Sequence, residues 1–315
     1  MALPLVIIAG PTAVGKSDFA IKLAKRINGE IISADSMQVY RGMDIGSAKV
    51  TKDEMQGVKH YLIDILNPKD EFSVAVFKEY AEAAIKEITA KGKVPIVAGG
   101  TGFYIQALLY DIDFYESIGE NPEYRSFLLK EYKEKGADYL FDKLKEVDAK
   151  TAEIIHKNDE KRVVRALEFY HETGKPISLH NKEQYEKKSG YNFAYFVLND
   201  YRETIYKKID ARVDIMIEKG LVSEVERLKN VGMTITAVSM QGLGYKEILL
   251  YLNGEISLDE AIYRIKRDSR HFAKRQITWF KRERDVIWLN KYDFDYDAEK
   301  LMEYACGVLR DKSII

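Results

Sequence analysis

Short apolar runs rich in β-branched residues recur along the first third of the chain. They read LVIIA (5–9), EIIS (30–33), YLIDI (61–65) and VPIVAGG (94–100). Their apolar positions are largely uninterrupted, as is typical of strands buried on both faces of a parallel sheet. The same character returns in two later runs, FAYFVL (193–198) and VIWL (286–289). We therefore predict one parallel sheet built from these segments.

Helical spacing separates the predicted strands. In the clearest case apolar residues three and four positions apart form one stripe, made by Val74, Phe77, Ala81, Ala84, Ile85 and Ile88. Strands that alternate with such helices predict an α/β fold, in which helices cover both faces of the sheet.

The composition changes in the middle of the chain. From about Asp113 to Gly190 the sequence is rich in Glu, Lys and Tyr, has helical spacing and lacks a strand pattern. One segment, RVVRALEFYHETG (162–174), ends on Gly174, a residue suited to cap a helix. We predict an inserted all-helical domain over 113–190. It divides the catalytic core into residues 1–112 and 191–315, the second of which ends in amphipathic helices.

Composition limits the classes of protein. Hydrophobic residues make up 46% of 315, enough for a full core, and the net charge is only −1, so any contact with nucleic acid must come from local patches. The single cysteine, Cys306, excludes an internal disulfide framework. No segment approaches the ~18 apolar residues that span a bilayer. We expect a cytoplasmic protein without a membrane partner and, by default, a monomer.

The sequence IAGPTAVGKSD (8–18) follows the first strand and matches G-x-x-x-x-G-K-[ST]. Glycines let backbone N–H groups converge on phosphate oxygens, the lysine adds a positive charge, and the serine hydroxyl suits Mg²⁺. Together with the sheet, the motif predicts a P-loop NTPase-like core. The predicted phosphate-binding residues are Gly10, Pro11, Thr12, Ala13, Val14, Gly15, Lys16 and Ser17. The motif leaves open which polyphosphate binds.

Polar residues follow two further strands. SADSMQVYRGMDIGSAK (33–49) begins at the end of the second, and ligands of parallel sheets bind at the carboxyl ends of strands. We therefore expect Asp35, Ser36 and Gln38 to face the phosphate loop, although Asp35 could instead cap a helix. AGGTGFY (98–104) places Thr101 at another strand end, and by itself this is a weak signal.

These motifs, taken in order, resemble those of the tRNA dimethylallyltransferase (tRNA isopentenyltransferase) family of the bacterial type. The resemblance runs from about Leu5 to Leu289. It rests on GPTAVGKS, SADSMQVYRGMDIGSAK, GGTGFY, NDEKRVVRALE, DYRETIYKKIDARVDIMIEKGLVSEV, GLGYKE and AKRQITWFKR. It implies transfer of a dimethylallyl group from dimethylallyl diphosphate to the exocyclic N6 of the adenosine on the 3′ side of the tRNA anticodon.

The resemblance also assigns roles in the reaction. The loop from Gly10 to Ser17 would hold the donor's diphosphate rather than ATP, with Ser17 helping to place Mg²⁺. Arg202 would contact the same diphosphate. Asp35 would be the general base, within a segment that grips the base and runs on through Ser36, Met37 and Gln38. Thr101 would line the channel where donor and base meet.

Further residues would contact tRNA. From Ala261 to Asp285 the chain holds nine Lys or Arg and three Asp or Glu, a stripe suited to phosphates, although ion pairs on a solvated helix are the usual alternative. The residues implied are Arg125, Lys161, Arg162, Arg165, Gln241, Gly242, Gly244, Tyr245, Lys246, Lys274, Arg275, Gln276 and Trp279.

Other functions are weighed against prenyl transfer. A P-loop kinase that uses ATP would explain the loop and the sheet. It would not explain the basic stripe or the DSMQ segment, residues 35–38. Prenylation of free adenine nucleotides would need neither the insertion nor the stripe, and a non-catalytic RNA-binding module would not need the phosphate loop. Asp64 fits either a metal-orienting carboxylate or a turn.

Overall fold

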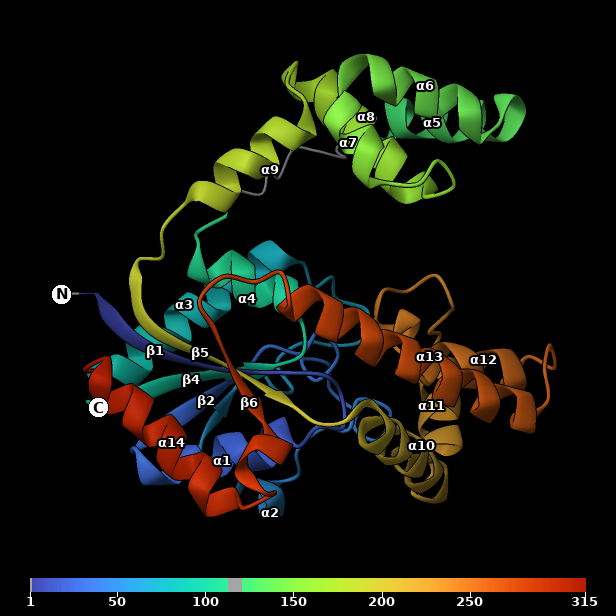
Figure 1. Ribbon diagram of the computed structural model, residues 1–315. Helices are drawn as coiled ribbons and strands as arrows, with labels where there is room; N and C mark the ends of the chain where they lie inside the picture. Colours follow the sequence, from blue (N-terminus) through green and yellow to red (C-terminus); the bar gives the residue numbers. More distant parts are fainter. Residues whose placement is uncertain (1, 113–120) are drawn as a thin grey trace. The chain divides into compact units, whose positions relative to one another are not determined.

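Six parallel strands form the central sheet in the computed structural model, which describes residues 2–112 and 121–315. Their order across the sheet is β3-β2-β4-β1-β5-β6 (Figure 1). The strands are β1 (Leu3–Ala9), β2 (Gly29–Ser33), β3 (His60–Tyr61), β4 (Val94–Gly99), β5 (Tyr191–Asn199) and β6 (Val286–Asn290). The predicted parallel sheet is confirmed, and β1 lies inside it, between β4 and β5.

The third strand is shorter than the apolar pattern predicts. Residues 61–65 were expected to be extended, but only His60 and Tyr61 pair with β2. Leu62 and Asp64 have φ angles of 61° and 56°, so the chain turns there. The backbone N–H of Ile65 then bonds the carbonyl of Val39 at 2.9 Å, which ties the turn to the segment after β2.

Helices cover both faces of the sheet, as the strand pattern predicts (Figure 1). α1 (Lys16–Arg26) and α14 (Ala298–Asp311) share one core with the sheet, while α3 (Val74–Ala90) and α4 (Gly102–Leu109) pack on the other face. The short α2 (Lys52–Met55) follows the segment after β2. In α3 the predicted stripe is buried except for its first member, Val74, which is half-buried.

A second set of helices extends from the carboxyl ends of the strands. These are α10 (Arg202–Glu218), α11 (Leu221–Asn230), α12 (Tyr245–Leu252) and α13 (Leu258–Phe280), with the short helices η1 (Ser239–Gln241) and η2 (Lys291–Phe294). The long α13 packs against α10, α12 and α4. In the described parts of the chain, none of the helices has the length and apolar character needed to cross a membrane.

The chain divides into two compact units. One comprises Met1–Leu109 and Gly190–Ile315, and the other is Tyr110–Ser189. The second unit holds α5 (Pro122–Lys135), α6 (Ala137–Val147), α7 (Ala149–Ile154), α8 (Glu160–Thr173) and α9 (Ile177–Glu186) around its own apolar core. Gly174 caps α8 with a φ of 67°, as predicted. The predicted start of the insertion, residue 113, lies outside the described residues.

Candidate active site

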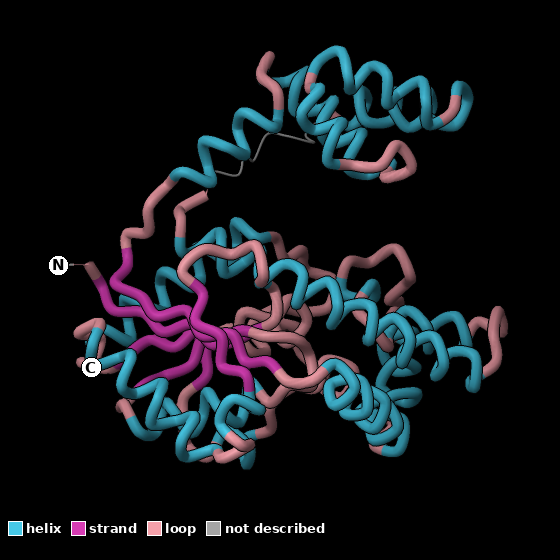
Figure 2. The backbone as a smooth tube through the Cα atoms, in the orientation of Figure 1, coloured by secondary structure: helices cyan, strands magenta, loops and turns pink. Residues whose placement is uncertain are grey.

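The loops that follow four strands lie at one edge of the sheet, because parallel strands present their carboxyl ends to the same side. β1 leads into residues 10–17, β2 into 34–38, β4 into 99–101 and β5 into Asp200, and Figure 2 shows these loops beside the C-terminal helices. The loops after β1, β2 and β4 border a cavity of about 770 Å³. The predicted site residues that line it are Thr12, Ala13, Gly15, Lys16, Ser17, Asp35 and Gln38.

The phosphate loop has the backbone that anion binding requires. Gly10 and Gly15 have φ angles of 143° and 94°, which side chains disfavour. α1 begins at Lys16, so the free N–H groups of its first turn are available to an anion. The Lys16 ammonium donates to the carbonyl of Pro11 at 2.8 Å. Pro11 and Val14 are buried and support the loop from beneath.

Two poorly solvated cations, Lys16 and Arg212, line the cavity together with Asp35. Burial, followed by repulsion from the Arg212 guanidinium, lowers the pKa of Lys16 to about 7, and Asp35 opposes both effects in part. Burial also lowers the pKa of Arg212, again against the influence of Asp35. Within the described chain Arg212 has no ion-pair partner. A bound anion would therefore stabilise both cations.

Arg202, expected at the diphosphate, does not line this cavity. It is the first residue of α10, and its Nε donates to the Tyr206 hydroxyl at 2.9 Å. Arg212, about three turns further along the same helix, does line the cavity, whereas the contact of Arg202 with the diphosphate stays a prediction. A signal for Arg212 was present, since the cavity-lining residues of α10 repeat at helical spacing: Lys208, Ala211, Arg212, Ile215, Met216 and Lys219.

Asp35 is held at the cavity by its own backbone. Its Oδ1 accepts hydrogen bonds from the N–H groups of Met37 at 2.8 Å and Gln38 at 3.3 Å. No helix begins directly after Asp35, so the helix-capping alternative is wrong, and Oδ1 instead holds the turn at residues 35–38. Among the described residues Oδ2 accepts no hydrogen bond, which leaves it available to a ligand.

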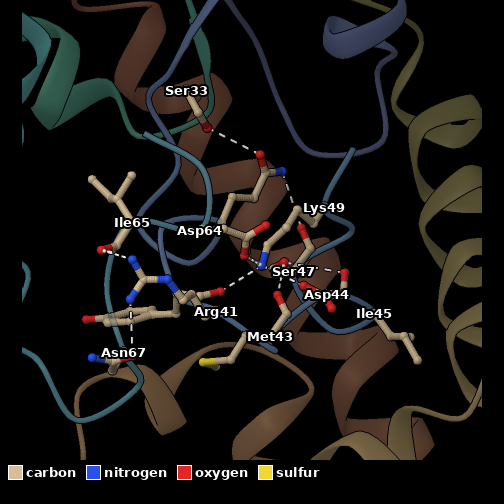
Figure 3. Close-up of polar contacts among 12 residues, drawn as sticks. Ser33, Arg41, Met43, Asp44, Ile45, Ser47, Lys49, Asp64, Ile65 and Asn67 are labelled. Carbon is tan, nitrogen blue, oxygen red and sulfur yellow. Dashed lines mark hydrogen bonds and ion pairs between the residues drawn. The ribbon is translucent and has the colours of Figure 1, made fainter. Parts of the chain in front are cut away.

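The amide of Gln38 is used within the protein. Its Oε1 accepts from the Ser33 hydroxyl at 3.2 Å, and its Nε2 lies 3.5 Å from the carbonyls of Ser47 and Ala48 (Figure 3). Both donor and acceptor thus connect β2 with the opposite wall of the cavity. Gln38 borders the cavity but does not present a free amide to it.

The cavity wall after the DSMQ segment is built around Lys49 (Figure 3). The Lys49 side chain is 5% exposed, and its ammonium contacts Asp44 Oδ1 at 2.6 Å and Asp64 Oδ1 at 2.5 Å. It also donates to the carbonyl of Tyr40 at 2.6 Å. Asp64 is therefore an ion-pair partner within a turn, as the turn interpretation predicts.

A buried carboxylate fixes the same wall from the C-terminal helices. Glu224 of α11 is 1% exposed, and its oxygens accept from the backbone N–H groups of Asp44, Ile45 and Gly46 at 2.9–3.1 Å. The Tyr245 hydroxyl donates to Glu224 Oε1 at 2.8 Å. Burial, with Glu224 beside it, raises the pKa of Tyr245. Tyr245 is therefore a core residue, although it was predicted to contact tRNA.

Gln276 joins the phosphate loop to the loop after β4. Its Oε1 accepts from the backbone N–H of Thr12 at 2.8 Å, and its Nε2 donates to the carbonyl of Gly100 at 2.9 Å. Gln276 is buried and joins two loops of the site, while its contact with tRNA stays a prediction. Thr101 is half-buried and lies outside the cavity lining, where its carbonyl accepts from the N–H of Tyr104 at 3.0 Å.

Comparison with known proteins decides the family. The model of the IPP transferase family matches residues 38–283. The chain is 58% identical over 312 residues to a tRNA dimethylallyltransferase of Lachnoclostridium phytofermentans, covering 99% of each, and 54% identical to one of Acetivibrio thermocellus, covering 95% of each. The chain belongs to the IPP transferase family.

Solved structures of this family have the same fold. The full-length tRNA isopentenylpyrophosphate transferase of Bacillus halodurans matches with a TM-score of 0.72 at 42% identity, covering 98% of both chains. A eukaryotic dimethylallyltransferase acting on tRNA matches with a TM-score of 0.78 at 31% identity, covering 92% of this chain and 74% of that one. The chain is accordingly a transferase with a P-loop-like sheet, and nothing in these comparisons supports a kinase.

The predicted nucleic-acid contacts of this transferase differ in accessibility. Gln241 and Lys246 are exposed, whereas Gly244 is buried. Gly242 lies against the DSMQ segment, because a methyl group on it would come within 2.9 Å of Met37 Cε. Ser36, like Met37, is half-buried. The 241–246 segment therefore supports the Asp35–Gln38 segment as well as presenting two polar side chains.

Some cations of the stripe on α13 form ion pairs with α10, whereas others are exposed and form no ion pair with the described residues. Arg270 pairs with Asp210 at 2.5 Å and Lys266 with Asp214 at 2.6 Å, so these two connect α13 to α10. Lys274 and Arg275 are exposed and pair with no carboxylate in the described residues. Trp279 is half-buried, and its indole packs on Gly102, where a methyl group would meet it at 2.3 Å.

The helical unit carries four predicted contacts. Lys161 and Arg162 are exposed on α8, and Arg162 lies 3.4 Å from Asp159. Arg165 is half-buried, which lowers its pKa. Arg125 donates to both oxygens of the buried Glu168, at 3.2 and 2.9 Å. Arg125 is therefore already paired with a buried carboxylate, whereas the side chains of Lys161 and Arg162 are exposed to solvent.

The cavity lining contains oxygen atoms that could hold a magnesium ion together with substrate phosphates. Ser17 is exposed in the first turn of α1, and Asp18 and Asp35 line the same cavity. In the described chain no three His, Cys, Asp or Glu residues are grouped as a metal site. Mg²⁺ usually keeps several waters and takes one or two protein ligands plus substrate phosphates, so these oxygens fit it.

Proposed function

We propose that this transferase moves a dimethylallyl group from dimethylallyl diphosphate to the exocyclic N6 of the adenosine on the 3′ side of the tRNA anticodon. The observation that carries the proposal is the cavity in which Lys16 and Arg212 lie with Asp35. It combines an anion site with a candidate base. The relatives named tRNA dimethylallyltransferase, and the similar structure of an enzyme acting on tRNA, support it.

Asp35 is suited to activate the nucleophile. The amine of adenine is a weak nucleophile because its lone pair is delocalised, and it must lose a proton as it attacks. A carboxylate held in position can accept that proton. The backbone bonds to Oδ1 fix Asp35 while Oδ2 is available to the amine. In the transfer the carbon–oxygen bond of the donor breaks, its electron pair leaves with the diphosphate, and a carbon–nitrogen bond forms with the adenine amine.

The phosphate loop and α10 stabilise the leaving group. Diphosphate gains negative charge as it departs, and donors placed where charge develops typically contribute ~10²–10³ in rate each. The N–H groups at the start of α1, Lys16 and Arg212 are such donors. We also propose that Mg²⁺, held through Ser17 and the diphosphate, would supply further charge neutralisation. Gly10, Pro11, Ala13 and Val14 would maintain the loop around the anion.

The tRNA would be oriented by cations and would present one base to the cavity. Turning a base out of a stacked loop costs a few kcal/mol. We propose that the exposed Lys274, Arg275 and Lys246 bind phosphates, with Lys161 and Arg162 of the helical unit contributing further contacts. We further propose that the protein acts as a monomer in the cytoplasm.

A labelling experiment tests the proposal. Purified protein is given radiolabelled dimethylallyl diphosphate, Mg²⁺ and unmodified tRNA whose anticodon loop carries a run of adenosines. We expect label in the tRNA at N6 of one adenosine and release of diphosphate without ATP. A kinase would instead consume ATP stoichiometrically and leave the tRNA unlabelled, which would overturn the proposal.

A further inference from the structure

The carboxyl end of β6 lies at the same edge as the site but has no role in the proposed function. In the sheet β5 lies between β1 and β6, so the segments that follow these three strands are neighbours. β1 leads to the phosphate loop, β5 to Asp200 and β6 to Lys291. The side chain of Lys291 consequently reaches the loop: a methyl group on Gly15 would come within 3.2 Å of its Nζ.

The backbone around Lys291 is held in place. Lys291 begins η2, and its carbonyl accepts from the N–H of Tyr296 at 3.0 Å. The preceding residue, Asn290, accepts a hydrogen bond from Asn199 Nδ2 at 3.0 Å, which joins the ends of β5 and β6. The backbone of Lys291 is therefore fixed beside the phosphate loop by its hydrogen bond and by the end of β6.

The carboxylates near Lys291 form their hydrogen bonds and ion pairs with other groups. Burial lowers its pKa, Lys208 and Lys22 lower it further, and Asp200 and Asp18 oppose them. Both carboxylates have partners already. Asp200 Oδ2 accepts a hydrogen bond from the Lys208 ammonium at 3.1 Å. Its Oδ1 accepts from the Tyr296 hydroxyl at 3.1 Å and from the backbone N–H of Tyr201 at 2.8 Å. Asp18 forms an ion pair with Lys22 at 2.9 Å.

In the described chain Lys291 makes no ion pair or side-chain hydrogen bond of its own. A half-buried ammonium beside two other lysines is unfavourable unless an anion joins it. The Nζ of Lys291 lies beside Gly15 of the phosphate loop, so an anion held by that loop would also be near Lys291. Lys208, on the other side of Asp200, already lines the cavity.

We propose that Lys291 is an additional binding residue for the donor's diphosphate, acting with Lys208 beside Gly15. The inference rests on the proposed function for the identity of the donor, but the chemistry needs only a diphosphate. Lys291 would contribute mainly to holding the donor and the released diphosphate. The conversion step would depend more on Lys16 and Arg212, which lie in the cavity with the candidate base.

Affinity measurements with matched variants test this. Lys291→Met is compared with Lys300→Met, which removes an exposed lysine that contacts Asp295 at 3.6 Å in the same C-terminal segment. Each protein is titrated by calorimetry with inorganic diphosphate and, without tRNA, with dimethylallyl diphosphate. We expect Lys291→Met to weaken both affinities by about tenfold, the usual loss for a hydrogen bond to a charged group, and Lys300→Met to leave them unchanged.

Two further readouts separate binding from structure. Lys291→Arg should restore most of the affinity, and in the transfer assay Lys291→Met should raise KM for the donor far more than it lowers kcat. Unchanged diphosphate affinity in Lys291→Met would overturn the inference, as would a loss confined to tRNA affinity. If the wild type binds diphosphate through Lys291 but transfers no dimethylallyl group, the proposed function fails while the anion site stands.

Discussion

At the scale of single residues, the site is defined by charged side chains whose partners are incomplete. Lys16 donates only to a backbone carbonyl, Arg212 has no ion pair in the described chain, and Asp35 uses one carboxylate oxygen for its own turn. Burying such groups without partners costs free energy. They are therefore the groups whose replacement should change ligand binding and turnover more than stability.

Replacing Asp35 by Asn tests the base. The amide keeps an oxygen for the Met37 and Gln38 N–H groups, so the turn should survive, but it cannot accept the proton. We expect the single-turnover rate of transfer to fall by about 10²–10⁴-fold with tRNA affinity nearly unchanged. Glu226→Gln, which removes an exposed carboxylate outside the cavity lining, is the control. A Asp35→Asn variant that turns over normally would remove Asp35 from this role.

Two arginines of α10 provide a direct comparison. Arg212→Met removes a cation that lines the cavity, whereas Arg202→Met removes one that contacts Tyr206. We expect the first to reduce kcat/KM for the donor by about 10²–10³-fold and the second to change it only slightly. Steady-state kinetics with varied donor concentration decides between them. The reverse order would support the assignment of Arg202 to the diphosphate.

The lowered pKa of Lys16 predicts proton uptake on binding. With a pKa of about 7, the side chain is mostly neutral in the free protein at pH ~8.5, and a bound diphosphate favours the charged form. Donor binding should then take up nearly one proton at that pH and almost none at pH ~6. Calorimetry in buffers of different ionisation enthalpy measures this.

Lys16→Arg is the matched control for that measurement, because arginine stays charged throughout and the donor's own ionisation is common to both proteins. Equal proton uptake in the two proteins would contradict the lowered pKa of Lys16.

The same pKa affects the stability of the free protein. Between pH ~7 and ~10.5 the unfolded chain binds more protons than the folded chain, because Lys16 is charged only in the unfolded chain. The contribution of Lys16 to the free energy of unfolding should therefore rise with pH across this interval.

At the scale of elements, helices from the C-terminal third hold the loops of the site. α13 supplies Gln276 to two loops, and α11 supplies Glu224 to the wall at residues 44–46. Neither helix follows a strand of the sheet directly. The loops after the strands are thus fixed by side chains that approach from outside the sheet.

Replacing Gln276 by Met tests this support. The change leaves the N–H of Thr12 and the carbonyl of Gly100 unpaired in a partly buried place, which should lower the free energy of unfolding by about 2 kcal/mol. Urea denaturation measures this loss, and donor affinity should fall with it. Thr278→Ala on the exposed side of α13 is the control. Normal donor affinity in a destabilised Gln276→Met variant would restrict Gln276 to stability.

At the scale of the whole molecule, the two units have separate cores. The helical unit packs Leu128, Leu140, Leu144, Val163 and Leu167 among themselves, and the cavity is lined entirely by residues of the other unit. Binding of the diphosphate should therefore be independent of the insertion. Binding of tRNA should require both units, because predicted contacts lie on each.

Deleting the helical unit tests this division. Residues 110–189 are replaced by a flexible Gly/Ser linker, and the folded product is checked by circular dichroism and thermal unfolding. We expect diphosphate affinity close to that of the full chain and loss of measurable tRNA affinity in a filter-binding assay. A variant that remains folded but binds neither ligand would refute the independence of the diphosphate site.

The sequence by itself determined the sheet, the phosphate loop and the family. Apolar runs and the glycine–lysine–serine spacing are local patterns, and local backbone preferences act on neighbouring residues. It also located Asp35 and Lys16, because a residue directly after a parallel strand can only lie at the sheet's ligand-binding edge.

Only the tertiary structure decided which distant side chains reach that edge. Arg212 at the cavity, Gln276 between two loops, Tyr245 in the core and Lys291 beside Gly15 all depend on how helices pack across the sheet. A polar or charged residue on an amphipathic helix has the same local pattern whether it faces solvent, a loop or a cavity. Its partner is fixed by packing, which no short stretch of sequence specifies.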